Sequence, residues 1–196
     1  MKILNIAASV AAAVLAVVFT CLGSFSEISD YDVVSGIAVD YEEGSWRVTC
    51  EICMPSSDND FGSSSIYVSG EGDTLESAFE NAGRKSANIL YTGCNQLYLI
   101  GKGARSSREL YEYFLKDDVN LRAVTVYTEG LAGDTLAGEK NDDNSRAKSL
   151  TIAKKVVRFC GEQGLPSPKV TEYLKDNFIV TVSEDETPVK AVADNV

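Results

Sequence analysis

The stretch from Tyr67 to Ile100 constrains the fold most, because its pattern predicts a strand, a helix and a second strand in succession. In its middle part, apolar residues recur at helical spacing and charged residues occupy the opposite side. Asp73 or Thr74 is suited to cap the helix, and Glu76, three residues after Asp73, is suited to complete a capping box. A helical crossover of this length can join two parallel neighbouring strands. The stretch therefore predicts a sheet with a helix on one face.

An uncharged apolar run occupies residues 3–23, directly after Lys2. Such a run is long enough to cross a bilayer as a helix, and it also matches the apolar part of an export signal. A buried helix of a globular core is usually shorter. Lys2 before the run and the acidic residues Glu27, Asp30 and Asp32 after it favour a body that is exported. We therefore expect residues 1–23 to be a signal peptide or a membrane anchor.

Cys21 lies at the end of this run, where a lipoprotein signal places its lipidated cysteine. A lipoprotein signal prefers a small residue before that cysteine, and Thr20 departs from this preference. The residues leave two alternatives open, a lipid attached to Cys21 and an uncleaved helical anchor. Both alternatives tether the rest of the chain to a membrane.

The charge and the missing histidines exclude several functions. Among 196 residues, 18 are Lys or Arg and 29 are Asp or Glu, which gives a net charge of -11. Such a charge repels phosphate backbones and anionic lipid heads, so we expect no nucleic-acid binding. The chain has no histidine, which removes the commonest general base and many zinc sites. We expect no catalytic residue, no metal, no cofactor and no enzymatic activity.

The other segments predict further strands and helices. Alternation around a Glu-Glu-Gly-Ser turn predicts a β-hairpin from Val33 to Met54. For the helix that ends near Gln163, we expect Leu150, Ala153, Val157 and Cys160 to face inward. Together the segments predict an α+β fold, with a mixed sheet of about five or six strands and about three helices packed mainly on one face. The remaining predicted elements are a helix from Ser106 or Ser107 to Lys116, a strand from Arg122 to Tyr127, a short helix from Leu131 to Gly138 and a strand from Phe178 to Ser183.

Two short motifs have a structural and a functional interpretation. Cys50 and Cys53 form a C-x-x-C pair, but residues three apart on a strand point to opposite faces, so burial is favoured over a redox or zinc site. Disulfides among Cys50, Cys53, Cys94 and Cys160 stay open, since four cysteines allow three connectivities. The Gly-Glu-Gly run from Gly70 to Gly72 lacks the further residues of a nucleotide-binding loop. It therefore favours a tight turn from strand to helix.

Four runs of the chain form a set with a characteristic order and spacing, namely Ile28 to Tyr41, Val68 to Ala78, Leu90 to Gly101 and Glu112 to Asp118. Together they resemble the N-terminal part of the spore germination lipoproteins, the C subunits of nutrient germinant receptors. The chain departs from that family at Cys94, where the family has a histidine, and at Thr20. Members of that family are longer and carry further C-terminal domains, so we expect this chain to be a truncated or minimal form.

The resemblance implies a non-enzymatic subunit on the outer face of a membrane, the inner spore membrane, where it assembles with membrane-embedded receptor subunits. It implies an architectural role for five residues, namely Gly36, Asp40, Gly70, Gly72 and Glu76. We expect a family-like domain over residues 24–170 and, over 171–196, a tail or the start of a truncated second region. The alternative is a stand-alone extracytoplasmic module that binds a small ligand or acts as a scaffold. An enzyme that uses carboxylates alone is disfavoured, because no two carboxylates pair convincingly in the sequence.

Overall fold

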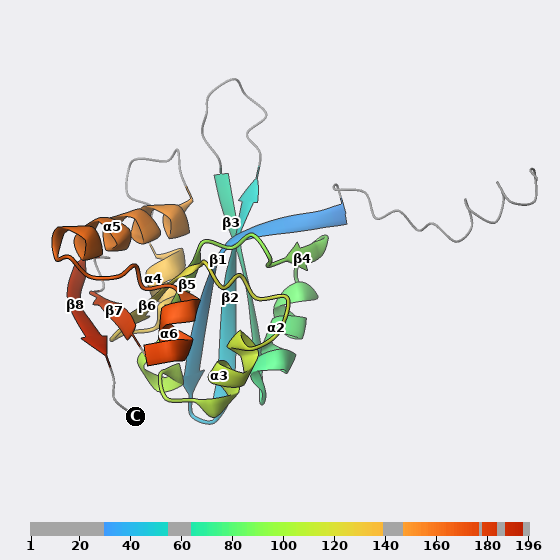
Figure 1. The fold of residues 1–196 in the computed structure, drawn as a ribbon. Helices are drawn as coiled ribbons and strands as arrows, with labels where there is room; N and C mark the ends of the chain where they lie inside the picture. The colour runs from blue at the N-terminus through green and yellow to red at the C-terminus, as the bar shows by residue number, and fades with distance from the viewer. Residues whose placement is uncertain (1–29, 55–63, 139–146, 177, 184–186, 194–196) are drawn as a thin grey trace, which may run out of the picture. The chain divides into compact units, whose positions relative to one another are not determined.

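A computed structural model describes residues 30–54, 64–138, 147–176, 178–183 and 187–193 (Figure 1). The strands are β1 (Tyr31–Glu42), β2 (Ser45–Met54), β3 (Ser64–Gly72), β4 (Ile89–Tyr91), β5 (Leu97–Ile100), β6 (Val124–Thr128), β7 (Phe178–Val182) and β8 (Pro188–Ala193). The α-helices are α2 (Leu75–Gly83), α3 (Arg108–Phe114), α4 (Ala132–Ala137), α5 (Lys148–Glu162) and α6 (Val170–Asp176). A short 3-10 helix, η2, covers Lys102–Ala104.

The predicted hairpin is confirmed. β1 and β2 pair in antiparallel fashion and close with Glu42 opposite Ser45. The two residues of the turn, Glu43 and Gly44, have φ angles of 51° and 86°. Positive φ at both central residues matches the right-handed twist of the flanking strands, and glycine adopts it without steric penalty. The turn therefore fixes the register of the hairpin.

The sheet places the strands in the order β3-β2-β1-β5-β6-β7-β8, and β4 pairs with β1. β1, β5, β6 and β7 run parallel, whereas β2 and β3 join through antiparallel pairs. The long strands before and after α2, β3 and β5, are not neighbours in the sheet. β3 and β5 are parallel but separated by β2 and β1. The tight hairpin holds β2 beside β1, so β5 joins the other edge of β1.

Two hydrophobic cores lie on the two faces of the sheet. Ile37 and Val39 of β1 face one core, and Ala38 between them faces the other. Helices α2, α3 and α6 cover the first core, and α4 and α5 cover the second (Figure 1). The α+β class is confirmed, but the helices cover both faces rather than mainly one. The reason is that the central strands are apolar on both sides.

The sheet has eight strands in the part of the chain that the structure describes, rather than five or six. The sequence pattern missed β4, which has only three residues, and β8 near the C-terminal end. It also missed α6. β7 and β8 continue the same sheet beyond β6. The domain boundary that we expect near residue 170 stays a prediction.

Helix α5 shows a different inward face from the predicted one. Ala153 and Cys160 are buried as expected, but Val157 is 44% exposed and Leu150 is only partly buried. The helix also buries the polar Ser149 at its N-terminal end. The predicted face was wrong because apolar residues occur on both sides of α5, and the sheet buries the side that begins with a serine.

Candidate functional site

Asp40 is a buried carboxylate at the end of β1, on the face that α4 covers. Its Oδ1 accepts a hydrogen bond from the backbone N–H of Ala132 at 2.7 Å, and its Oδ2 accepts one from Gly133 at 2.8 Å. These N–H groups belong to the first turn of α4, which has no helical acceptor for them. Burial raises the pKa of Asp40, against the effect of these two hydrogen bonds. Asp40 therefore fixes the start of α4 against the sheet.

Glu51 holds the start of α5 in the way that Asp40 holds the start of α4. The sequence analysis did not single out this residue. It lies on β2 and is 0% exposed. Its carboxylate accepts the backbone N–H groups of Lys148 at 2.7 Å and Ser149 at 2.9 Å, and the hydroxyls of Ser35 and Tyr67 at 3.0 Å each. Burial opposes ionisation of Glu51, but the hydrogen bonds from Ser149, Lys148 and Ser35 outweigh it and lower its pKa. Two buried carboxylates thus hold the N-terminal ends of the two helices on this face.

Gly36 lies opposite Glu51 in the β1–β2 ladder. A Cβ atom on Gly36 would lie 2.4 Å from the Cβ of Ser149, which is closer than two nonbonded carbon atoms can approach. The missing side chain therefore makes room for the first turn of α5. This contact is consistent with the architectural role expected of Gly36.

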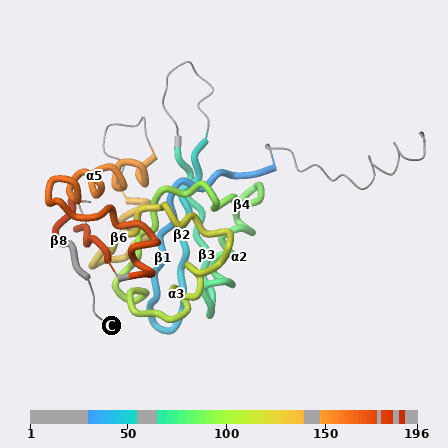
Figure 2. Tube along the Cα trace, viewed as in Figure 1, coloured from blue at the N-terminus to red at the C-terminus, as the bar shows by residue number. Residues whose placement is uncertain are grey.

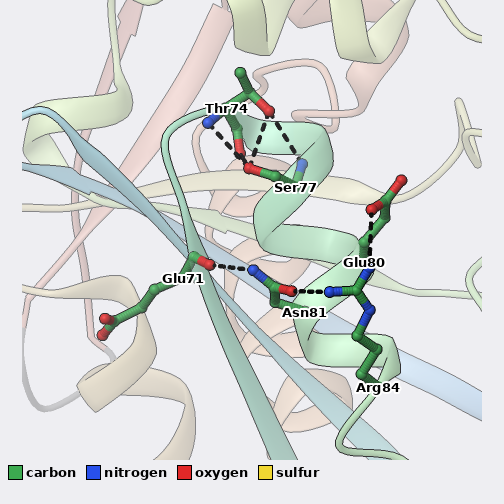
Figure 3. Close-up of polar contacts among 6 residues, drawn as sticks. All are labelled: Glu71, Thr74, Ser77, Glu80, Asn81 and Arg84. Atoms are coloured by element: carbon green, nitrogen blue, oxygen red, sulfur yellow. Dashed lines mark hydrogen bonds and ion pairs between the residues drawn. The ribbon is translucent and has the colours of Figure 1, made fainter.

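Gly70 and Gly72 also make room for a helix, α2, on the other face of the sheet. A Cβ on Gly70 would lie 2.1 Å from the backbone nitrogen of Ala82, and one on Gly72 would lie 2.7 Å from that of Ala78. The backbone of α2 therefore lies directly on β3. The side-chain amide of Asn81 adds a hydrogen bond of 2.7 Å to the carbonyl of Glu71 (Figure 3).

The capping box of α2 differs from the predicted one. Thr74 is the N-cap, its hydroxyl accepts the backbone N–H of Ser77 at 3.1 Å, and the hydroxyl of Ser77 accepts the backbone N–H of Thr74 at 3.1 Å (Figure 3). The prediction that Asp73 and Glu76 form the box was wrong, because the cap lies one residue later. Glu76 is exposed and instead forms an ion pair with Lys116 at 3.4 Å.

The four cysteines in the described part of the chain are free. Cys50 lies in the core that α2 covers and Cys160 in the core that α5 covers, so the sheet separates them. Cys50 and Cys53 do not pair, in agreement with the predicted divergence along the strand. Cys21, the candidate lipid site, lies outside the described residues.

The described residues contain no group of three histidine, cysteine or acidic side chains that could hold a metal ion. Within the same ranges, the helices are too short or too polar to span a bilayer. The apolar run of residues 3–23 lies outside these ranges.

β4 is the short strand that pairs with the first residues of β1 (Figures 1 and 2). An open groove lies beside it. Tyr31, residues 89–93 and residues 117–122 line the groove, which has a volume of about 670 Å³. Its walls carry exposed apolar side chains and the exposed carboxylates of Asp117 and Asp118. We call it the β4 groove. The sequence analysis missed it, because its walls come from three separate segments and β4 was not predicted.

A comparison with protein families decides where the chain belongs. The family model described as the spore germination protein N-terminal domain matches residues 24–153, which is more than half of the chain. The chain belongs to this family. The match confirms the resemblance seen in the sequence and makes the chain a spore germination protein domain. No curated protein and no solved structure matches the chain.

Within the family, the matched region begins just after the apolar run of residues 3–23 and ends inside α5. It includes Asp40 and Glu51 with the helix starts that they hold, and both walls of the β4 groove. β7 and β8 lie beyond the matched region.

Proposed function

We propose that this chain is a membrane-tethered, non-enzymatic subunit of a nutrient germinant receptor complex. The observation that carries the proposal is the family match over residues 24–153, which directly follows the apolar run of residues 3–23. In this proposal the apolar run, or a lipid on Cys21, holds the domain at the exported face of the inner spore membrane. Membrane-embedded receptor subunits are its partners.

The geometry favours a rigid binding body over a catalyst. Asp40 and Glu51 are buried on the sheet, and helix N–H groups engage both carboxylates. They lie in the packed layer between β1, β2 and the two helices, whereas a catalytic acid or base must reach a substrate. The β4 groove has one wall on β4, which pairs with β1, and one on residues 117–122, which Asn120 ties to the carbonyl of Asn95. Such fixed walls suit the docking of another protein.

The intact mass of the protein extracted from its native membrane tests the tether. A chain that begins at Cys21 and carries a diacylglyceryl group supports a lipid anchor, and an unprocessed chain supports a helical anchor. A chain that lacks residues 1–23 and carries no lipid contradicts the proposed tether.

Co-purification from native membranes in mild detergent tests the complex. We expect the chain to elute together with polytopic membrane proteins, in a particle larger than the chain alone. Elution as a clean monomer contradicts the receptor-subunit proposal. The alternative of a stand-alone extracytoplasmic module then remains. A thermal-shift screen with amino acids and sugars tests that alternative.

A further inference from the structure

We propose that the β4 groove binds an extended, positively charged and partly apolar segment of a receptor partner. The inference rests on the proposed function, since it names the surface through which this domain meets a membrane-embedded subunit. Strand pairing, exposed apolar side chains, charge and preorganisation each contribute to it.

β4 is a strand with an available edge. It pairs with β1 through Tyr31, Asp32 and Val33, and with no other strand in the described residues. An edge strand exposes backbone N–H and C=O groups that can pair with another extended chain. β3 and β8 are the other edge strands of the described sheet, but neither lines the groove. β4 can therefore accept a partner segment by strand addition, while its side chains select the partner.

The groove exposes large apolar side chains to solvent. Ile89 is 58% exposed, Tyr91 is 46% exposed and Leu121 on the facing wall is 42% exposed. Single exposed apolar residues are common, but several around one groove mark an interaction site. The groove is open to solvent, whereas sites for small molecules enclose most of the ligand. A polypeptide segment therefore fits it better than a small ligand.

The charges of the groove select the occupant. Asp117 and Asp118 are exposed in its wall, and Arg122 is the cation that lines it. The whole chain has a net charge of -11. A second copy of the chain would bring the same acidic groups, and an anionic lipid surface would be repelled in the same way. A segment that carries Lys or Arg next to apolar residues complements both features of the groove.

Hydrogen bonds hold both walls of the groove in place before any partner binds. The carboxylate of Asp32 accepts hydrogen bonds from the hydroxyl of Ser86 and, at 3.0 Å, from the amide of Asn88, which fixes the chain just before β4. The side-chain amide of Asn120 donates to the carbonyl of Asn95 at 2.7 Å, which fixes the facing wall. A site with fixed walls loses little conformational entropy on binding.

Site-specific photo-crosslinking in the native host tests the proposal on the full chain. Benzoylphenylalanine replaces Ile89 or Leu121 in the groove, and Val157 on α5 as a control, since Val157 is also exposed but does not line the groove. We expect positions 89 and 121 to form an adduct with a membrane-embedded receptor subunit, and position 157 to form none. Mass spectrometry should place the crosslink in a segment with Lys or Arg beside apolar residues.

Charge variants sharpen the test. The double substitution Asp117→Lys and Asp118→Lys should lower the crosslinking yield by about tenfold or more, because it places like charges in contact. The matched substitution of both residues by Glu should preserve the yield. An adduct with a second copy of the chain or with lipid, or equal yields in both double variants, overturns the proposal.

The outcomes separate this inference from the proposed function. If the chain co-purifies with membrane-embedded subunits but positions 89 and 121 give no adduct with them, the groove assignment is wrong and the proposed function stands. If the chain co-purifies with no membrane protein, both fail.

Discussion

Gly36 and Glu51 face each other across the β1–β2 ladder, and together they position the first turn of α5. Glu51 accepts the N–H groups of Lys148 and Ser149, and the missing side chain of Gly36 lets Ser149 approach the sheet. One strand pair thus supplies both the acceptor and the space that this helix start requires.

Gly36→Ala should destabilise the protein by about 1–3 kcal/mol, because the new methyl group overpacks the contact with Ser149. Urea unfolding followed by circular dichroism measures the change. Gly161→Ala is the matched control, since Gly161 lies in α5 with nothing within 4 Å of the added carbon. The control should gain about 0.5–1 kcal/mol from helix propensity. Equal effects of the two substitutions would show that α5 does not pack closely on Gly36.

Glu51 and Asp40 should give opposite pH dependences of stability. The pKa of Glu51 lies below its ordinary value of 4.5, so its contribution is complete above pH 4.5 and is lost as the pH falls through the lowered pKa. The pKa of Asp40 lies above its ordinary value of 3.8, so its contribution is complete below pH 3.8 and is lost as the pH rises through the raised pKa.

Unfolding free energies of the wild type, Glu51→Gln and Asp40→Asn between neutral and acidic pH test this contrast. At neutral pH, Glu51→Gln should cost about 1–3 kcal/mol, because its amide group faces N–H donors. On acidification the advantage of the wild type over Glu51→Gln should shrink. The stability of the wild type relative to Asp40→Asn should grow. Two differences that move in the same direction contradict the assignment.

Local patterns in the sequence predicted the elements whose partners are near in the chain. The β1–β2 hairpin, α3 and β6 follow from alternation, turn residues and a serine cap. The function of Glu51 could not be predicted in this way. On β2 it alternates with Arg47 and Thr49, a pattern typical of a solvent-facing side, and its helix donors lie 97 and 98 residues later. That side is nevertheless buried, because α5 returns to cover it.

The β4 groove could not be predicted for a related reason. The groove forms where Tyr31, β4 and residues 117–122 lie close together in the fold. None of these segments carries a recognisable motif. The second layer of helices was missed because a strand that is apolar on both sides gives no periodic signal of which face is covered.

Gly70→Ala should destabilise the protein by more than the control Gly83→Ala. The new carbon on Gly70 meets the backbone of α2, which cannot move aside as a flexible side chain can. Gly83, the last residue of α2, has nothing within 4 Å of an added carbon. Thermal unfolding should show a lower Tm for Gly70→Ala, and an unchanged or higher Tm for Gly83→Ala. A reversed order would contradict direct packing of α2 on β3.

Thr74→Ala and Glu76→Gln separate the observed capping box from the one expected from the sequence. Thr74→Ala removes the N-cap acceptor and should cost about 0.5–2 kcal/mol. Glu76→Gln breaks only an exposed ion pair with Lys116 and should change the stability by less than about 0.5 kcal/mol. Chemical unfolding of both variants measures the difference. A larger loss of stability for Glu76→Gln than for Thr74→Ala would favour the capping box of Asp73 and Glu76 that the sequence suggested.

Thiol labelling should distinguish the cysteines by their burial. Cys94 is exposed, whereas burial raises the pKa of Cys50 to about 12 and Cys160 lies buried in the opposite core. A maleimide should therefore label Cys94 in the native protein, and label Cys50 and Cys160 only after unfolding, because the thiolate is the reactive form. Peptide mapping by mass spectrometry locates the label. A disulfide-linked peptide pair of Cys50 and Cys160 would contradict their separation by the sheet.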